Sequence, residues 1–170
     1  LNGHSDVIGG AVVAADPVQV DDLRNWANVV GSTGAPFDAW LTLRGLRTLF
    51  ARMEQQQRNA MIVAQYLDRH TAVSQVHYPG LVVHPGHRIA SRQQRGFGAM
   101  LSFELAGGVE AVRRFVAAVG YFTLAESLGG IESLVAHPAT MTHADMGEEA
   151  RSRAGRHLRT PRRRKPCSRR

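Results

Sequence analysis

The order of apolar and polar positions along the chain predicts helices and strands in alternation. Residues 7–15 (VIGGAVVAA) form an apolar, β-branched run, which is typical of a buried strand. Apolar residues then recur at helical spacing over residues 20–30, and again over a long stretch at 36–70. Within that stretch we expect Gly45 to mark a break and the polar residues 54–58 to form a solvated turn.

Shorter elements follow in the second half of the chain. The apolar pattern predicts strands, in order, over residues 73–78, 98–105, 121–125 and 133–136. Helical spacing predicts helices over residues 87–94 and 109–119, and a further helix that begins near residue 147. Strands that alternate with helices are the mark of the α/β class, so an α/β fold is expected.

The composition indicates a soluble, globular protein. The chain has 170 residues, of which 44% are hydrophobic and 21% charged. Its apolar runs all fall short of the ~18 residues that a membrane span requires, and no signal peptide is visible. Cys167 is the single cysteine and has no partner within the chain, which fits a reducing compartment. We therefore expect a cytoplasmic protein without a membrane partner.

The charge is distributed very unevenly. Residues 1–150 contain 11 arginines and 14 acidic residues, a net charge of −3. The last 20 residues contain nine arginines and Lys165 but no acid, a net charge of +10. The formal charge of +7 therefore comes entirely from the tail, and the asymmetry suggests two unlike segments.

Several blocks resemble, in order, the Cys/Met-metabolism family of pyridoxal-phosphate enzymes. The matching blocks are residues 2–6 (NGHSD), 31–47 (GSTGAPFDAWLTLRGLR), 52–54 (RME), 58–60 (RNA), 96–105 (GFGAMLSFEL) and 124–143 (LAESLGGIESLVAHPATMTH). The resemblance covers residues 1 to about 155. It is highly specific, because long blocks recur in the right order at sensible spacing.

The resemblance implies a fragment of a fold-type I pyridoxal-phosphate-dependent transferase. Residues 1–65 would be the end of the cofactor-binding domain with its connecting helix. Residues 66–155 would be most of the small C-terminal α/β domain, with a mainly antiparallel sheet. Residues 156–170 depart from the family and are expected to be an aberrant, disordered basic tail. Because the first part would lack most of its sheet, we expect exposed apolar surface.

The family uses pyridoxal phosphate as an electron sink, and a lysine amine holds this cofactor. By resemblance, that lysine would lie two positions before Leu1, in a Thr-Lys-aromatic motif. This chain contains one lysine, Lys165, which lies in the tail. We therefore assign no catalytic residue to the chain and expect it to be inactive alone.

Residues 125–130 (AESLGG) resemble the cystathionine γ-synthases and γ-lyases within the family, whereas β-lyases usually lack this glutamate. By resemblance, Ser127 would help to hold the substrate carboxylate or the link between cofactor and lysine. Glu126 would lie beside the amino group at the distal end of the substrate. The alternative is a strand end whose polar residues cap a turn.

A metal site is not expected. His84 and His87 have the i, i+3 spacing of some metal ligands, but no cysteine or carboxylate lies close by in the sequence, so a surface loop is expected.

The leading functional prediction is γ-replacement, in which the thiol of cysteine displaces the acyl group of an O-acylhomoserine. The partners would be these small molecules, and the intact protein would be a homo-oligomer. The alternatives are a γ-lyase of the same family and a non-catalytic, anion-binding remnant. The remnant would use the tail to bind nucleic acid or lipid in a salt-sensitive way. We favour a reading-frame error as the origin of the tail, because an evolved tail normally follows a completed domain.

Overall fold

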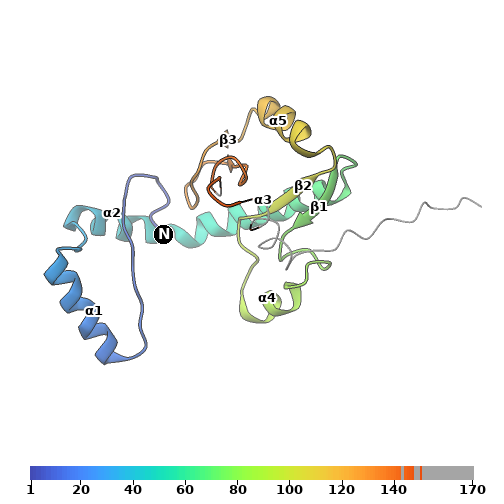
Figure 1. The fold of residues 1–170 in the computed structure, drawn as a ribbon. Coiled ribbons are helices and arrows are strands. Elements are labelled where there is room, and N and C mark those ends of the chain that lie inside the picture. Colours follow the sequence, from blue (N-terminus) through green and yellow to red (C-terminus); the bar gives the residue numbers. More distant parts are fainter. Residues whose placement is uncertain (143, 148–149, 151–170) are drawn as a thin grey trace, which may run out of the picture. The chain divides into compact units, whose positions relative to one another are not determined.

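A computed structural model describes residues 1–142, 144–147 and 150 (Figure 1). The chain divides into two compact units. The first comprises Leu1–Glu54 with Ser127–Glu132, and the second comprises Gln55–Glu126 with the described residues from Ser133 onward. The domain boundary that the sequence predicts at residue 65 stays a prediction. The basic tail and most of the helix expected after residue 147 lie outside the described residues.

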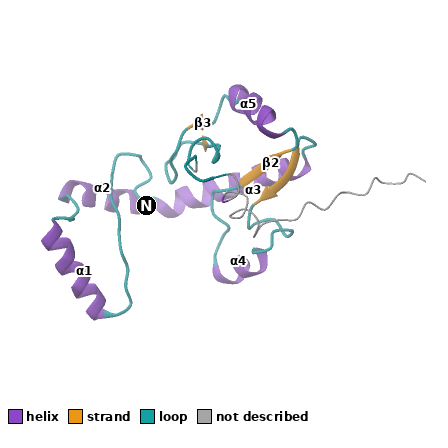
Figure 2. Ribbon diagram, viewed as in Figure 1, coloured by secondary structure: helices purple, strands orange, loops and turns teal. Residues whose placement is uncertain are grey.

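The first unit begins with an extended segment and two helices (Figure 2). Helix α1 (Pro17–Val30) confirms the predicted helix and has well-defined ends. Oδ1 of Asp16 accepts a hydrogen bond of 2.9 Å from the N–H of Val18, and Pro17 occupies the first turn. Gly31 ends the helix at φ 72°, a left-handed conformation that glycine adopts without a steric cost.

The prediction of a buried strand at residues 7–15 is wrong. This segment is irregular and mostly exposed, and Ile8 and Val13 are 98% and 94% exposed. A strand needs a neighbour to satisfy its backbone N–H and C=O groups, and the described chain pairs no strand with this segment. The apolar side chains of α1 are exposed as well, including Trp26 at 68%, so the expectation of exposed apolar surface is confirmed.

The long helical stretch is interrupted in a different place from the predicted one. Helix α2 spans Pro36–Leu46 and helix α3 spans Leu49–Arg69, so the break falls at Arg47 and Thr48. Gly45 lies inside α2. The polar residues 54–58 continue α3 without a turn, because glutamate, glutamine and arginine are good helix formers that need no burial.

The second unit contains the hydrophobic core. It comprises most of α3, strands β1 (Val73–His77) and β2 (Ser102–Leu105), and helices α4 (His87–Gln93) and α5 (Gly108–Ala118). The buried core residues are Ala60, Ala64, Val76, Tyr78 and Leu81. Ala60 and Ala64 are one helical turn apart, and their small side chains let the other core residues approach the helix closely. The ring of Phe103 on β2 meets Phe115 on α5 edge to face at 5.4 Å between centroids.

The strands form two separate pairs. β1 and β2 are antiparallel, whereas β3 (Thr123–Leu124) and β4 (Leu134–Val135) are parallel. The four predicted strands therefore exist, but the expected mainly antiparallel sheet holds only for the first pair. β2 begins four residues later than predicted, because Gly98 has φ +76°, which lies outside the strand region. None of the described helices is long and apolar enough to cross a membrane.

Candidate functional site

The two predicted site residues lie in the loop that follows β3. The N–H of Ala125 donates a 3.1 Å hydrogen bond to the carbonyl of Val135, and the chain then leaves the β3–β4 pair. Glu126 and Ser127 come next, and both are exposed. Their side chains make no hydrogen bond with another described residue, so they are available to a ligand. Their roles in binding stay predictions.

This loop approaches the start of the chain within the first unit. Residues Ser127–Glu132 belong to the same compact unit as Leu1–Glu54. A Cβ atom on Gly130 would lie 3.1 Å from the hydroxyl of Ser5, so the two backbones come close together. Ser5 has φ +56°, an uncommon conformation for a residue other than glycine. Within the first unit, the structure thus brings Ser5, from the sequence block 2–6, beside Gly130, from the block 125–130.

Arg52, in the first turn of α3, contacts the beginning of the chain. Its Nη2 donates to the carbonyl oxygens of Leu1 and Asn2 at 3.2 and 3.4 Å. Its Nη1 donates to the carbonyl oxygen of Gly45 at 2.8 Å and to the hydroxyl of Thr48. One guanidinium therefore joins the N-terminal segment to the junction between α2 and α3.

Two glycines make this arrangement possible. Gly3 is buried at φ +85°, and a Cβ atom there would lie 2.5 Å from Nη2 of Arg52. Gly45 is also buried, and a Cβ atom there would overlap the carbonyl oxygen of Asn2. Any larger side chain at either position would push the N-terminal segment away from the helices.

Asn2 contributes a side chain to the same place. Its Oδ1 accepts a 2.9 Å hydrogen bond from the N–H of His4. Its Nδ2 is buried and has no hydrogen-bond partner among the described residues. An unpaired buried donor is costly, so this atom is a point at which an acceptor would stabilise the segment.

The histidine-containing loop at residues 84–87 belongs to the second unit. Nδ1 of His84 accepts a 3.0 Å hydrogen bond from the N–H of Gly86, and Nδ1 of His87 donates to the carbonyl of Pro79 at 2.7 Å. Burial, and then the neighbouring His77 and His87, lowers the pKa of His84 below its usual range.

The predicted surface loop is found: Pro85 is exposed, and Gly86 and the two histidines are only partly buried. In the described part of the chain, no group of three or more His, Cys, Asp or Glu side chains could hold a metal ion. The two histidines therefore stabilise the loop.

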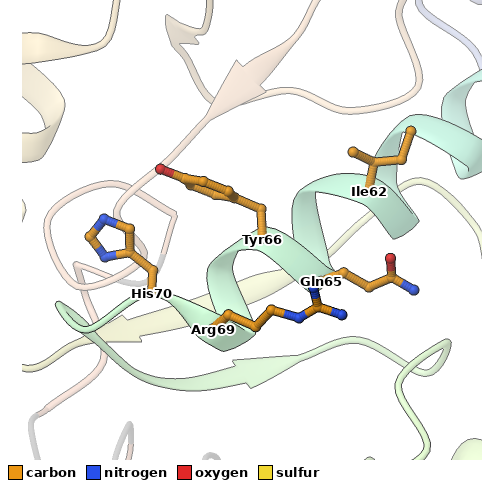
Figure 3. Close-up of a pocket in the computed structure, with 5 residues that line it drawn as sticks. All are labelled: Ile62, Gln65, Tyr66, Arg69 and His70. Atoms are coloured by element: carbon orange, nitrogen blue, oxygen red, sulfur yellow. The ribbon is translucent and has the colours of Figure 1, made fainter.

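Two open grooves lie on helix surfaces, one in each unit. The groove on α3 is lined by Ile62, Gln65, Tyr66, Arg69 and His70 (Figure 3). Within it, Tyr66 and His70 project from adjacent turns, and their ring centroids are 5.7 Å apart. The groove on α2 is lined by Trp40, Leu43, Arg44 and Arg47. Neither groove includes Glu126 or Ser127, so neither corresponds to the predicted site.

The family of the chain follows from comparison with known proteins. The family model for Cys/Met metabolism PLP-dependent enzymes matches residues 1–159. The chain belongs to this family. The predicted family and its pyridoxal-phosphate cofactor are thereby confirmed.

Individual members of the Cys/Met metabolism family are similar over most of this chain. Cystathionine gamma-synthase of Escherichia coli strain K12 is 57% identical over 155 residues, which cover 91% of this chain and 40% of that protein. Cystathionine beta-lyase of Coxiella burnetii is 48% identical over 156 residues, which cover 91% of this chain and 40% of that protein. The chain spans about two fifths of the length of these relatives.

A solved structure of the family shows the same fold. The cystathionine gamma-synthase from Xanthomonas oryzae pv. oryzae, in complex with aminoacrylate and cysteine, matches with a TM-score of 0.87 and 62% identity. The match covers 94% of this chain and 41% of that one. The expected α/β fold, a fragment of the fold of these pyridoxal-phosphate enzymes, is therefore confirmed.

The described residues do not form a complete cofactor site for this family. A lysine amine is needed to hold pyridoxal phosphate covalently, and the single lysine of the chain, Lys165, lies outside the described residues. Glu126 and Ser127 are exposed, and neither lines one of the two grooves described above. Asn2 offers one unpaired donor but no counter-charge for a phosphate. None of these residues could hold the cofactor by itself.

Arg52 and Gly45 are the residues whose importance the sequence analysis missed. Gly45 carried a signal, because glycine costs about 1 kcal/mol in a helix and therefore often marks a close backbone approach. We interpreted it as a break instead. Arg52 carried no such signal, because three of its four partners are backbone carbonyls, which any residue supplies.

Proposed function

We propose that the chain is part of a cystathionine γ-synthase, which replaces the γ-substituent of an O-acylhomoserine with the sulfur of cysteine. The supporting observation is that the two relatives with identities of 57% and 62% are both γ-synthases. Identity is 57% to the γ-synthase of E. coli and 48% to the β-lyase of C. burnetii over almost the same residues. Among solved structures it is 62% to the γ-synthase of X. oryzae and 42% to the γ-lyase of Lactobacillus plantarum.

The proposed function gives roles to the two loop residues. The hydroxyl and N–H of Ser127 can donate hydrogen bonds to a substrate carboxylate. The carboxylate of Glu126 can pair with the ammonium group that cysteine brings to the product. Both residues are exposed beside β3, where a ligand can reach them. Related γ-synthase structures contain cysteine or cystathionine, which supports this substrate class.

The 170-residue chain is proposed to be inactive alone. The chemistry requires a lysine that can be neutral near pH 7 and can move protons between carbon atoms. Residues 1–164 contain no lysine. The proposed activity therefore belongs to a longer protein that contains this segment.

The deciding experiment measures both the synthesis and the cleavage of cystathionine by such a longer protein. We expect cystathionine to form from cysteine and an O-acylhomoserine. Glu126→Ala should raise the KM for cysteine roughly tenfold, the effect of losing one charge-assisted hydrogen bond, and should affect elimination without cysteine less. Glu110→Ala is the control, because Glu110 lies on the exposed surface of α5. Efficient cleavage of cystathionine without synthesis would instead assign a γ-lyase.

The γ-lyase is the second candidate, because the L. plantarum γ-lyase matches 93% of this chain with a TM-score of 0.85. For either function we propose that the intact protein is a homo-oligomer. The exposed tryptophans Trp26 and Trp40 support this proposal, since large exposed aromatic side chains are typical of surfaces that become covered.

A further inference from the structure

Arg52 joins two pieces of chain that are distant in sequence. Its guanidinium binds the carbonyls of Leu1 and Asn2 on one side, and Gly45 and Thr48 at the α2–α3 junction on the other. Leu1 and Asn2 lie 51 and 50 residues before Arg52 along the chain. Arg52 therefore carries this connection.

Arginine suits this task better than any other cation. Its planar fork presents five donors in a fixed arrangement and can serve four acceptors at once, whereas a lysine ammonium is a point charge with three donors. The carbonyl of Gly45 lies in the last turn of α2, where the helix dipole favours a positive charge. Arg52 is also half-buried, so water competes less for these acceptors.

We propose that Arg52 is a positioning residue that fixes the backbone of residues 1–3 against the α2–α3 junction. Gly3 and Gly45 provide the close approach that this contact needs. The same segment continues to Ser5, which lies against Gly130 in the loop of Ser127. Arg52 thus sets the position of one side of the candidate site without touching a ligand.

The consequence for catalysis rests on the proposed function. In a longer protein of this family, the segment that Arg52 holds would follow the lysine that bears the cofactor. A displacement of residues 1–3 would move the backbone of that lysine relative to the loop of Ser127. Even a small displacement of a reacting group slows the chemical step much more than it weakens binding.

The first arm of the test uses the 170-residue chain and no cofactor. The amide exchange rates of Gly3 and His4, measured by NMR, report opening of the N-terminal segment. Arg52→Ala should raise these rates roughly tenfold or more, since hydrogen bonds to a charged group are lost. Arg52→Lys should recover only part of the protection, and low millimolar guanidinium added to Arg52→Ala should recover more. The matched control is Arg24→Ala, because Arg24 is an exposed arginine of the same unit that pairs with the exposed Asp21.

The outcomes of this arm are distinct. Equal exchange rates in the wild type and Arg52→Ala would overturn the proposal. Amides in β1 and β2 serve as a folding reference within the same sample. If Arg52→Ala also speeds amide exchange in β1 and β2, the variant has lost part of its fold, and Arg52→Lys is used in its place. Full protection of the Gly3 amide in Arg52→Lys would show that a guanidinium is not required.

The second arm uses a longer protein that contains this segment and the lysine. Arg52→Lys should lower kcat roughly tenfold with little change in KM, and it should shift the pH at which the absorption band of the bound cofactor changes. If Arg52→Lys only reduced the fraction of folded protein, kcat would fall in proportion to that fraction and the pH of the absorption change would stay the same. That result would overturn the catalytic role of Arg52. If the wild-type protein forms no cystathionine, the proposed function fails, while the exchange rates still decide whether Arg52 holds the segment.

Discussion

The hydroxyl of Tyr78 donates a 2.9 Å hydrogen bond to the carbonyl oxygen of Gly98. Tyr78 is 1% exposed and follows β1, whereas Gly98 lies in the loop that leads to β2. This bond therefore joins the two sides of the core beyond the end of the β1–β2 ladder. The ring of Phe97 completes the contact by meeting Tyr78 edge to face at 6.5 Å between centroids.

Tyr78→Phe should lower the free energy of unfolding by about 1 kcal/mol, because the partly buried carbonyl of Gly98 loses its donor while the ring stays in place. Urea unfolding followed by circular dichroism measures this change. Tyr66→Phe is the control, because Tyr66 is 65% exposed and its hydroxyl faces water. An unfolding midpoint equal to that of the wild type would show that water replaces the tyrosine hydroxyl without loss.

Tyr78 should also make the protein sensitive to alkaline pH. Burial raises the pKa of Tyr78 above its ordinary value near 10. The unfolded chain therefore releases this proton before the folded chain does, so stability is complete below pH 10 and falls as the pH rises toward the folded value. Unfolding midpoints at pH 8 and pH 10.5 should differ more for the wild type than for Tyr78→Phe. If the unfolding midpoints of the wild type and Tyr78→Phe change equally between pH 8 and pH 10.5, Tyr78 is not the cause of the alkaline sensitivity.

His84 should make the protein sensitive to acid. Because its pKa is lowered by burial and by His77 and His87, the folded chain binds this proton less tightly than the unfolded chain. Stability is therefore complete above about pH 6.5 and falls as the pH drops through the folded value. Protonation would also remove the acceptor that Nδ1 offers to the N–H of Gly86.

The variant that tests this expectation is His84→Asn, whose Oδ1 can accept the same hydrogen bond but does not titrate. Urea midpoints at pH 5 and pH 7.5 should differ less for this variant than for the wild type. His4→Asn is the control, because His4 is exposed in the first unit. If His84→Asn retains the full acid sensitivity, other groups cause it.

Gly45→Ala should release the N-terminal segment while keeping α2 helical. Alanine favours a helix by about 1 kcal/mol over glycine, but its Cβ atom would overlap the backbone carbonyl of Asn2, which cannot rotate away. Amide exchange at Gly3 should quicken roughly tenfold even though helicity stays the same or rises. Gly34→Ala, where nothing lies within 4 Å, should leave exchange unchanged. If the Gly3 amide of Gly45→Ala exchanges as slowly as in the wild type, residues 1–3 shift to accommodate the added Cβ atom without opening.

Borohydride reduction in the presence of pyridoxal phosphate should not label a side chain in the described part of the 170-residue chain. The reduced adduct requires an amine, and residues 1–164 contain no lysine side chain. Peptide mapping by mass spectrometry locates any label. Specific, stoichiometric labelling of Lys165 would show that the basic tail takes part in cofactor binding, contrary to our expectation that it is inert.

Local sequence signals determined the elements whose ends are formed by neighbouring residues. The Asp16-Pro17 pair and Gly31 delimit α1, and alternation located β1, because caps and periodicity act over a few residues. The order of the motif blocks likewise determined the family and the place of Glu126 and Ser127 after a strand.

The tertiary structure alone decided what depends on distant partners. Residues 7–15 have the composition of a strand, but no strand in the described part of the chain pairs with them. Residues 54–58 are polar yet remain helical. Gly45 is needed where Asn2 approaches it, and Arg52 acts on carbonyls about 50 residues away. A backbone carbonyl is the same in every residue, so a contact to one leaves no trace in the order of side chains.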